Sequence, residues 1–162
     1  MKKTLFVLIA AFAVIISGCS TKSTSVSDGS TVDGRRGGSG SGDIFGVDGQ
    51  IIGAQKVYFD FDKFNIRADM QSVVKNNARF FNNEASGISF VVEGNCDEWG
   101  TDEYNQALGL KRAKAVKEAL VAQGVNSDRI SVKSYGETNP VCTEKTKACD
   151  AQNRRAEFRL AR

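Results

Sequence analysis

Charged side chains of both signs gather where a predicted strand gives way to a predicted helix. Asp97 and Glu98 lie in the polar turn after the strand, and Arg112 lies about three turns into the helix. A glycine-flanked loop at the carboxyl end of a strand is a common place for a ligand site. These residues therefore predict a site for a charged ligand. The alternative is that they are solvated surface charges.

The strand and the helix that flank this turn follow from their sequence patterns. Apolar and polar residues alternate over 88–93, which predicts a strand. Thr101 suits the N-cap of a helix over 102–123, and Asp102 and Glu103 suit its first turn, where the helix dipole favours negative charge. Apolar side chains at helical spacing predict a buried stripe on this helix, formed by Tyr104, Leu108, Ala115, Val116, Ala119 and Leu120.

The same reasoning places the other elements of a folded domain over 51–162. Period-two patterns predict three more strands and a helical pattern predicts one more helix: strands over 56–61, 130–135 and 155–160, and a helix over 67–83. The order β-α-β-α-β-β implies an α+β fold, in which the helices pack on a small, mixed, four-stranded sheet. A domain of about 110 residues is large enough for one core.

The composition excludes several classes of function. The chain contains no histidine, which excludes Ser-His-Asp and Cys-His nucleophile systems and every His-ligated metal site. The net charge is +3, and without Lys2 and Lys3 the balance is 20 basic against 19 acidic side chains. This gives no electrostatic argument for nucleic acid binding. No cofactor is expected, and no metal either, because the cysteines form no C-x-x-C pair.

Neighbouring carboxylates raise an enzymatic alternative. Asp97, Glu98, Asp102 and Glu103 could act as the acid and the base of a glycosidase. Adjacent carboxylates in one turn do not flank a sugar, however, and Asp102 and Glu103 already have a role at the start of the helix. We therefore expect a binding module and not an enzyme.

The N-terminus has the pattern of a bacterial export signal. A positively charged start precedes an apolar run over 5–16, which is too short to span a bilayer comfortably. Residues 16–19, Ile-Ser-Gly-Cys, resemble the lipobox at which lipoproteins are processed, so that 1–18 is expected to be removed and Cys19 acylated. Several acyl chains on one residue anchor a protein stably. The alternative is an ordinary signal peptide beside a coincidental cysteine.

The residues after Cys19 suggest an outer-membrane destination and a tether. In enterobacterial lipoproteins an Asp after the acylated cysteine signals inner-membrane retention, so Ser20 resembles a form sorted to the outer membrane, with its domain facing the periplasm. Residues 19–50 are rich in Ser, Thr, Gly and Asp, which predicts a disordered linker. Its end-to-end distance would be about 30 Å at rest and about 100 Å when pulled out.

Three cysteines remain besides Cys19. Cys142 and Cys149 lie seven positions apart in the segment before the last strand, and the periplasm is oxidising. A disulfide between them is predicted to hold an otherwise flexible segment, with a stabilisation of about 2–3 kcal/mol. Cys96 is then the odd cysteine, and its expected role is that of a small buried residue.

Four motifs follow one another along the predicted domain: VYFDFDKFNIR at 57–67, EGNCDEWGTDEYNQALGLKRAKAV at 93–116, SYGETNP at 134–140 and QNRRAEF at 152–158. In this order they resemble the peptidoglycan-binding domain of the OmpA-like family. The resemblance covers essentially the whole predicted domain, and it implies the fold and the ligand of that family.

The family binds the stem peptide of the cell wall through diaminopimelate, whose side chain ends in an ammonium and a carboxylate on one carbon. The resemblance implies that Asp97 binds the ammonium and Arg112 the carboxylate. If so, replacing either residue by Ala abolishes binding to sacculi and leaves thermal unfolding nearly unchanged. The further contacts that the resemblance implies come from Asn105, Leu108, Asp62 and one of Arg154 or Arg155. The strand period places Arg155 on the face opposite Phe158, which does not decide between the two arginines.

Two positions depart from the family pattern. Asn95 stands where many members have His, and it can still form hydrogen bonds. Trp99 stands where many have Arg, and it offers an apolar wall or a partner contact in place of a charge. Its simpler role is partial burial in the turn.

The resemblance also implies a biological setting. A member with a lipid anchor would hold the outer membrane to peptidoglycan, bind TolB and, as a further partner, TolA, and support envelope integrity and cell division. One alternative is a wall-anchoring lipoprotein outside the Tol system. The other is an enzyme that hydrolyses peptidoglycan.

Overall fold

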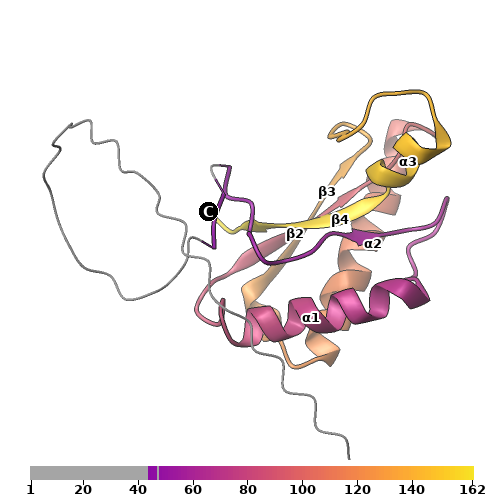
Figure 1. Cartoon of the computed structure of the whole chain (residues 1–162). Helices are drawn as coiled ribbons and strands as arrows, with labels where there is room; N and C mark the ends of the chain where they lie inside the picture. Colours follow the sequence, from indigo (N-terminus) through magenta and orange to yellow (C-terminus); the bar gives the residue numbers. More distant parts are fainter. Residues whose placement is uncertain (1–43, 47) are drawn as a thin grey trace, which may run out of the picture. The chain divides into compact units, whose positions relative to one another are not determined.

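The computed structural model describes residues 44–46 and 48–162. The predictions for the export signal, for Cys19 and for most of the linker lie outside these residues. The four strands form one sheet in the order β1-β4-β2-β3 (Figure 1). They are β1 (Val57–Tyr58), β2 (Phe90–Asn95), β3 (Ile130–Gly136) and β4 (Arg155–Leu160). β4 runs antiparallel to β1 and β2, and β2 runs parallel to β3, so the sheet is mixed, as predicted.

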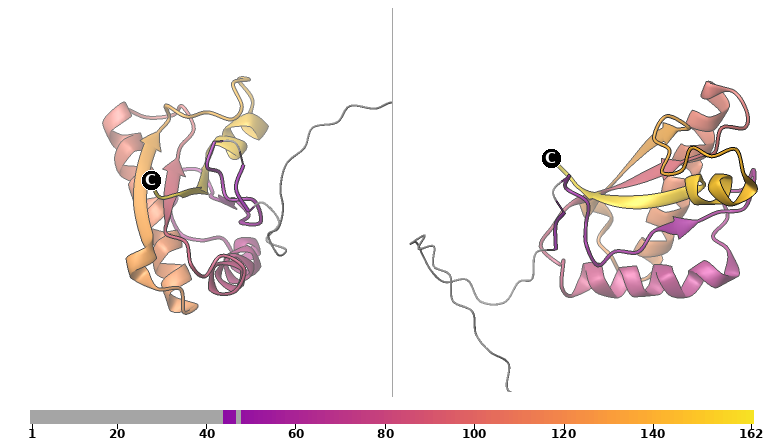
Figure 2. Two further views of the ribbon diagram at one scale, coloured as in Figure 1. Left: turned by 90° about the vertical axis from the view of Figure 1, so that its left-hand side faces the viewer. Right: turned by 45° about the horizontal axis from the view of Figure 1, so that its top comes forward.

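Two long helices pack on one face of the sheet (Figure 2). α1 (Gln71–Asn82) follows the short 3-10 helix η1 (Ala68–Met70), and α2 (Asp102–Ala122) follows β2. Phe81 of α1 stacks on Phe90 of β2 with 3.8 Å between the ring centroids, and Phe158 of β4 lies 5.3 Å from Phe81. This aromatic cluster is the centre of the core, and it fixes the sheet against the helices.

A third helix lies in the segment for which the sequence predicted only a disulfide. α3 (Lys147–Asn153) begins after Thr146, whose Oγ1 accepts a hydrogen bond of 3.2 Å from the backbone N–H of Cys149. The structure joins Cys149 to Cys142 by a disulfide. A helix, its cap and a covalent bond therefore hold this segment in place. A further 3-10 helix, η2 (Ser127–Arg129), precedes β3.

Two aromatic residues, one at the end of a predicted strand and one in the predicted buried stripe, are exposed. The first strand is shorter than 56–61, because the chain turns at 61–62, and Phe61 is 59% exposed. Tyr104 is 50% exposed, so the buried face of α2 is rotated away from the predicted stripe. That face carries polar as well as apolar side chains: Asn105, Leu108, Gly109, Arg112, Ala113, Val116 and Leu120.

Helix α2 crosses the sheet in backbone contact with it. A Cβ added to Gly94 of β2 would collide with the backbone of Gly109 of α2, and a Cβ added to Gly109 would collide with Ser134 of β3. The close approach of α2 to β2 is therefore the reason that position 94 requires glycine. Of the two glycines that flank the turn, Gly94 and Gly100, only Gly100 has a positive φ, +119°. This crossing brings the first three turns of α2 against the end of β2.

The folded domain begins before residue 51. Phe45 forms a β-bridge with Ile51, Gln50 forms one with Arg159, and the backbone N–H of Leu160 donates to the carbonyl of Gly49 at 2.8 Å. These residues lie beside the C-terminus, at the opposite end of β4 from α3 (Figure 1). These backbone hydrogen bonds could not be inferred from the amino-acid composition of this stretch. In the part of the chain described here, no helix has both the length and the apolar character that crossing a membrane requires.

Candidate functional site

A hollow of about 230 Å³ lies where the turn after β2 meets the segment after β1 and the start of α2. Thr101 caps α2 as predicted, since its Oγ1 accepts from the backbone N–H of Tyr104 at 3.2 Å. The residues that line the hollow are Phe61, Asp62, Asp97, Trp99, Gly100, Tyr104 and Leu108. Three of the predicted contacts, Asp62, Asp97 and Leu108, are thus brought together in one hollow.

Asp97 is a buried carboxylate with one engaged oxygen. Its side chain pairs with Arg154, whose Nη1 lies 2.8 Å from Oδ2, and the residue is 3% exposed. No hydrogen bond to Oδ1 is found within the described residues. Of the two neighbouring arginines, Arg154 is therefore the one beside the hollow, and Asp97 Oδ1 is the oxygen left for a ligand.

Arg112 is completely buried beside the same turn. Its guanidinium donates four hydrogen bonds, to the carbonyls of Lys63 (2.9 Å), Asn95 (2.9 Å) and Asp60 (3.2 Å) and to the Sγ of Cys96 (3.3 Å). Burial lowers the pKa of the Arg112 side chain. The side chain therefore ties the segment after β1 to the residues directly before Asp97, and of its five N–H groups one on Nη2 remains.

Burial changes the expectation of unchanged thermal unfolding for both residues, since Asp97→Ala would leave Arg154 without its buried carboxylate partner. Removing Arg112 would break four hydrogen bonds inside the protein, so Arg112→Ala is not expected to leave thermal unfolding unchanged. Arg112 lies near Asp97, because its Nη1 donates to the carbonyl of Asn95 and to the Sγ of Cys96, but it does not line the hollow.

Asp62 and Tyr104 form a second feature of the hollow. Asp62 is the one residue other than glycine with a positive φ (+55°) in the described chain, a conformation that Asp tolerates better than most residues. Tyr104 Oη donates a hydrogen bond to Asp62 Oδ1, and this bond raises the pKa of Tyr104. Sequence reasoning assigned Tyr104 to the core, and only its place in the first turn of α2, next to Gly100, could have suggested the rim.

Asn105 supports the turn from below and does not line the hollow. It is fully buried, and its Nδ2 donates to the backbone carbonyl of Asp97 at 3.3 Å and to the carboxylate of Glu137. Its Oδ1 is a buried oxygen with no hydrogen-bond partner among the residues that the structure describes. The structure thus places Asn105 behind Asp97, in a position to orient it.

Trp99 and Asn95, the two departures from the family pattern, differ in exposure. Trp99 is 58% exposed, and its Nε1 donates to Asp150 Oδ2 at 3.0 Å. Asn95 is fully buried, and its Oδ1 accepts from Asn139 Nδ2 at 3.2 Å. Asn95 is therefore part of the scaffold, whereas Trp99 stands at the hollow.

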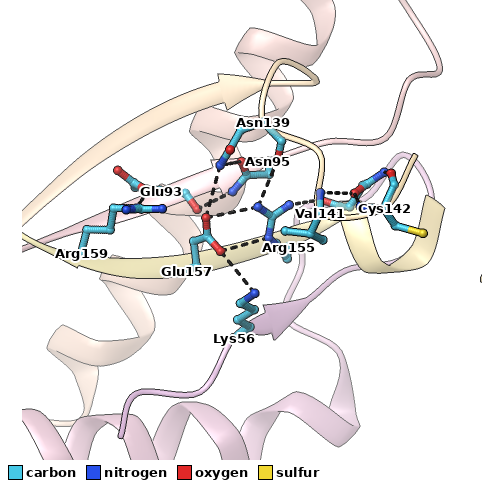
Figure 3. A network of polar contacts seen from close by, with 10 residues as sticks. Lys56, Glu93, Asn95, Asn139, Val141, Cys142, Arg155, Glu157 and Arg159 are labelled. Atoms are coloured by element: carbon cyan, nitrogen blue, oxygen red, sulfur yellow. Dashed lines mark hydrogen bonds and ion pairs between the residues drawn. The ribbon is translucent and has the colours of Figure 1, made fainter. Parts of the chain in front are cut away.

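Arg155 belongs to a different neighbourhood (Figure 3). It lies on the face of the sheet opposite α1 and α2, which we call the helix-free face. It is fully buried and donates to both oxygens of Glu157, at 3.1 and 3.2 Å, and to the carbonyl of Asn139 at 3.1 Å. Lys56 adds a longer contact of 3.6 Å to Glu157. The strand period correctly placed Arg155 opposite the core face, and these contacts separate it from the hollow.

Cys96 is a free thiol under the turn. It is buried, donates to the carbonyl of Asn105 at 3.3 Å, and has a pKa that burial raises to about 11. A thiol with so high a pKa is unreactive at neutral pH. Within residues 44–46 and 48–162, no group of three or more His, Cys, Asp or Glu side chains is arranged to hold a metal ion.

Fold and hollow together define a class: a small α+β binding domain with a carboxylate-lined hollow at the carboxyl end of a central strand. Residues 58–154 match the OmpA family. The chain therefore belongs to the OmpA family, as the four motifs predicted.

Two peptidoglycan-associated lipoproteins are similar in sequence to nearly the whole chain. The peptidoglycan-associated lipoprotein of Pseudomonas putida is 36% identical over 159 residues, which cover 95% of each chain. That of Mesorhizobium japonicum is 39% identical over 153 residues, which cover 93% of this chain and 88% of the other.

Solved structures show the same fold. The peptidoglycan-associated lipoprotein from Burkholderia pseudomallei superposes with a TM-score of 0.63 at 36% identity, covering 68% of this chain and 92% of that one. The C-terminal domain of Helicobacter pylori MotB gives a TM-score of 0.62 at 24% identity, with 67% and 84% covered. The second likeness is one of fold alone.

Proposed function

We propose that this protein is a non-enzymatic lipoprotein that binds peptidoglycan through the diaminopimelate of the stem peptide. Its relatives are named as peptidoglycan-associated lipoproteins. The observation that carries the proposal is the buried Asp97 carboxylate, which lines the hollow with one oxygen held by Arg154. The other oxygen, Oδ1, would accept a charge-assisted hydrogen bond from an ammonium, which contributes about 1.5–3 kcal/mol.

The two ends of diaminopimelate would meet different parts of the site. The ammonium would bind between Asp97 and Asp62, the two carboxylates that line the hollow. The carboxylate would approach the remaining N–H of Arg112. Since the segment after β1 covers this arginine, that contact requires residues 60–63 to move. Leu108 would pack against the methylene groups of the ligand.

The position of the site suits a tether between two surfaces. The N-terminal residues of the described domain join the C-terminal end of β4, while Asp97 and its partner Arg154 lie at the other end of the sheet. With Cys19 acylated in the outer membrane, load would enter and leave at opposite ends of the domain. Many weak contacts with one polymer would add up through avidity.

We further propose a place in the Tol-Pal system, with TolB, and TolA as a second partner, and a role in envelope integrity and cell division. A wall-anchoring lipoprotein outside that system is the alternative. Co-purification of TolB with the membrane-bound protein separates the two. Loss of the protein from the membrane fraction in Cys19→Ala tests the anchor.

The wall-binding proposal is tested with purified sacculi. The parent protein should sediment with sacculi and release no soluble fragments; released fragments would instead indicate a hydrolase. Asp97→Asn should lose sedimentation, because the amide cannot pair with an ammonium. Asp128→Asn, which changes an exposed carboxylate of η2, is the matched control and should sediment like the parent. Normal sedimentation of Asp97→Asn would contradict the proposed site.

A further inference from the structure

Side-chain contacts connect the turn that carries Asp97 to residues 142–154, which contain the disulfide and which we call the disulfide-held segment. Three consecutive side chains of the turn each bind a side chain between Cys142 and Arg154, the C-cap of α3. The three pairs are Asp97–Arg154, Glu98–Lys145 and Trp99–Asp150. The second of these is a surface ion pair of the kind that contributes little. The first fixes a buried carboxylate, and the third fixes an exposed indole.

The fixed indole is unusual because it is exposed. Trp99 is 58% exposed, yet its N–H is held 3.0 Å from Asp150 Oδ2. The other exposed rings at the hollow are Phe61, at 59%, and Tyr104, whose hydroxyl is bonded to Asp62. Aromatic rings from three segments therefore surround the hollow, and two of them are oriented by hydrogen bonds to carboxylates.

The chemistry of the lining indicates what these rings contact. The lining contains the carboxylates of Asp62 and Asp97 and no lysine or arginine. Aromatic faces attract cations, and tryptophan does so most strongly. Rings also cover methylene groups well. A hollow with carboxylates and aromatic rings suits an ammonium carried on an aliphatic chain.

We propose that Trp99 is a ligand-contacting residue, whose indole face covers the ammonium-bearing aliphatic side chain of the wall peptide, and that Asp150 is the residue that positions it. This inference rests on the proposed function and adds to it two residues that the family resemblance did not supply. Asp150 is itself fixed, because it lies in α3 directly after the disulfide-bonded Cys149. The orientation of the ring thus depends on the disulfide-held segment.

Trp99 is the only tryptophan of the chain, so tryptophan fluorescence, excited at the red edge where tyrosine does not absorb, reports on this side chain alone. The probe is a stem tripeptide that ends in meso-diaminopimelate, titrated into the full-length protein in detergent. We expect a saturable change in emission with the parent protein. The same peptide with 2-aminopimelate in place of diaminopimelate keeps the terminal carboxylate, lacks the ammonium and should give no change. An equal response to the 2-aminopimelate peptide would overturn the assignment of the ammonium-bearing chain.

Calorimetry with the same tripeptide measures the affinity of each variant. Trp99→Ala should bind about tenfold more weakly, as expected for a lost cation–π and packing contact. Phe64→Ala removes an aromatic side chain that is 43% exposed but does not line the hollow, and it should bind like the parent. If the parent binds and Trp99→Ala binds equally well, the inference is wrong while the proposed function stands. If the parent itself does not bind, the proposed function fails.

Asp150 is tested by loss and rescue. Asp150→Ala should lower the steady-state fluorescence anisotropy of Trp99 in the free protein and weaken binding about threefold, less than loss of the ring itself. Asp150→Asn keeps an acceptor oxygen and should restore both values. A purely structural role would not be rescued in the anisotropy of this one side chain. Unchanged anisotropy in Asp150→Ala would overturn the positioning role.

Discussion

Arg112 and Arg155 are both fully buried, but different groups surround their charges. On the helix-free face, Arg155 faces the carboxylate of Glu157 through two hydrogen bonds (Figure 3). Beside the hollow, Arg112 donates to three backbone carbonyls and a thiol, and no salt bridge in the described chain includes it.

The difference indicates which of the two regions can act on a ligand. Arg155 donates to both oxygens of Glu157, and the pair does not line the hollow, so it presents no free group there. A cation that is held only by dipoles and a neutral thiol keeps its net charge, and it acts on anions nearby. Arg155 is therefore a structural charge, while Arg112 is both a structural tie and a source of positive potential at the hollow.

The largest effect should come from breaking the compensated pair. Glu157→Ala leaves Arg155 buried without its carboxylate, which should lower the free energy of unfolding by about 3–5 kcal/mol. Urea denaturation measures this change. Binding to sacculi by the folded fraction should be unchanged, since neither residue lines the hollow.

A double variant tests whether charge is the cause. Arg155→Met combined with Glu157→Leu removes both charges and keeps the volume, so it should recover most of the lost stability. Failure of this recovery, together with a small effect of Glu157→Ala, would show that the carboxylate is not what compensates Arg155.

Arg112 should instead affect stability and binding together. Arg112→Met breaks four internal hydrogen bonds and should lower the free energy of unfolding by about 2–4 kcal/mol. It should also abolish binding to sacculi at temperatures where the variant remains folded. Circular dichroism establishes the folded fraction, and co-sedimentation measures the binding. Full binding by folded Arg112→Met would show that Arg112, like Arg155, has only a structural role.

Much of this domain was predictable because local patterns determine it. The alternation over 88–93, the cap at Thr101 and the helical spacing of α2 gave the strand, the helix and the corner that holds Asp97. The motifs then gave the family. The covering of Arg112 was not predictable, since its acceptors lie 16 to 52 positions away in the sequence.

The features that the sequence missed depend on tertiary contacts. α3 has a sequence, KACDAQN, with no apolar stripe, and its cap and the disulfide hold it in place. Tyr104 has an apolar body, and only the hydrogen bond to Asp62 fixes it at the rim. Period two assigned Arg155 to the helix-free face, but the choice of Arg154 for the hollow required the position of Asp97.

The disulfide-held segment contacts both arginine neighbourhoods, through Arg154 on one side and Asn153, whose carbonyl accepts from Arg155, on the other. The double variant Cys142→Ser/Cys149→Ser should lower the free energy of unfolding by about 2.5 kcal/mol. It should weaken the affinity for wall peptide more than it disturbs the Arg155 network, because the turn is bound to this segment only through side chains. Denaturation and calorimetry test both parts. Unchanged affinity would show that α3 keeps its place without the covalent bond.

The last prediction distinguishes the Arg112 and Arg155 neighbourhoods by how the free energy of unfolding depends on pH. Burial raises the pKa of Cys96 from about 9 to about 11, although the nearby Arg112 charge acts in the opposite direction. Between these values the unfolded chain releases a proton that the folded protein keeps. The free energy of unfolding should therefore be unaffected below pH 9 and decrease as the pH rises toward 11.

Cys96→Ala should remove this alkaline loss and leave the rest of the pH profile in place. The comparison is best made in the Cys142→Ser/Cys149→Ser background, where a Cys96 thiolate has no disulfide to attack. Thermal unfolding followed by circular dichroism at a series of pH values measures the difference between the two variants. Because the Arg155 neighbourhood contains no thiol, Glu157→Ala should lower the whole profile without changing its alkaline slope. Parallel profiles with and without Cys96 would mean that the thiol titrates as it does in water, and that the space around Arg112 is open to solvent.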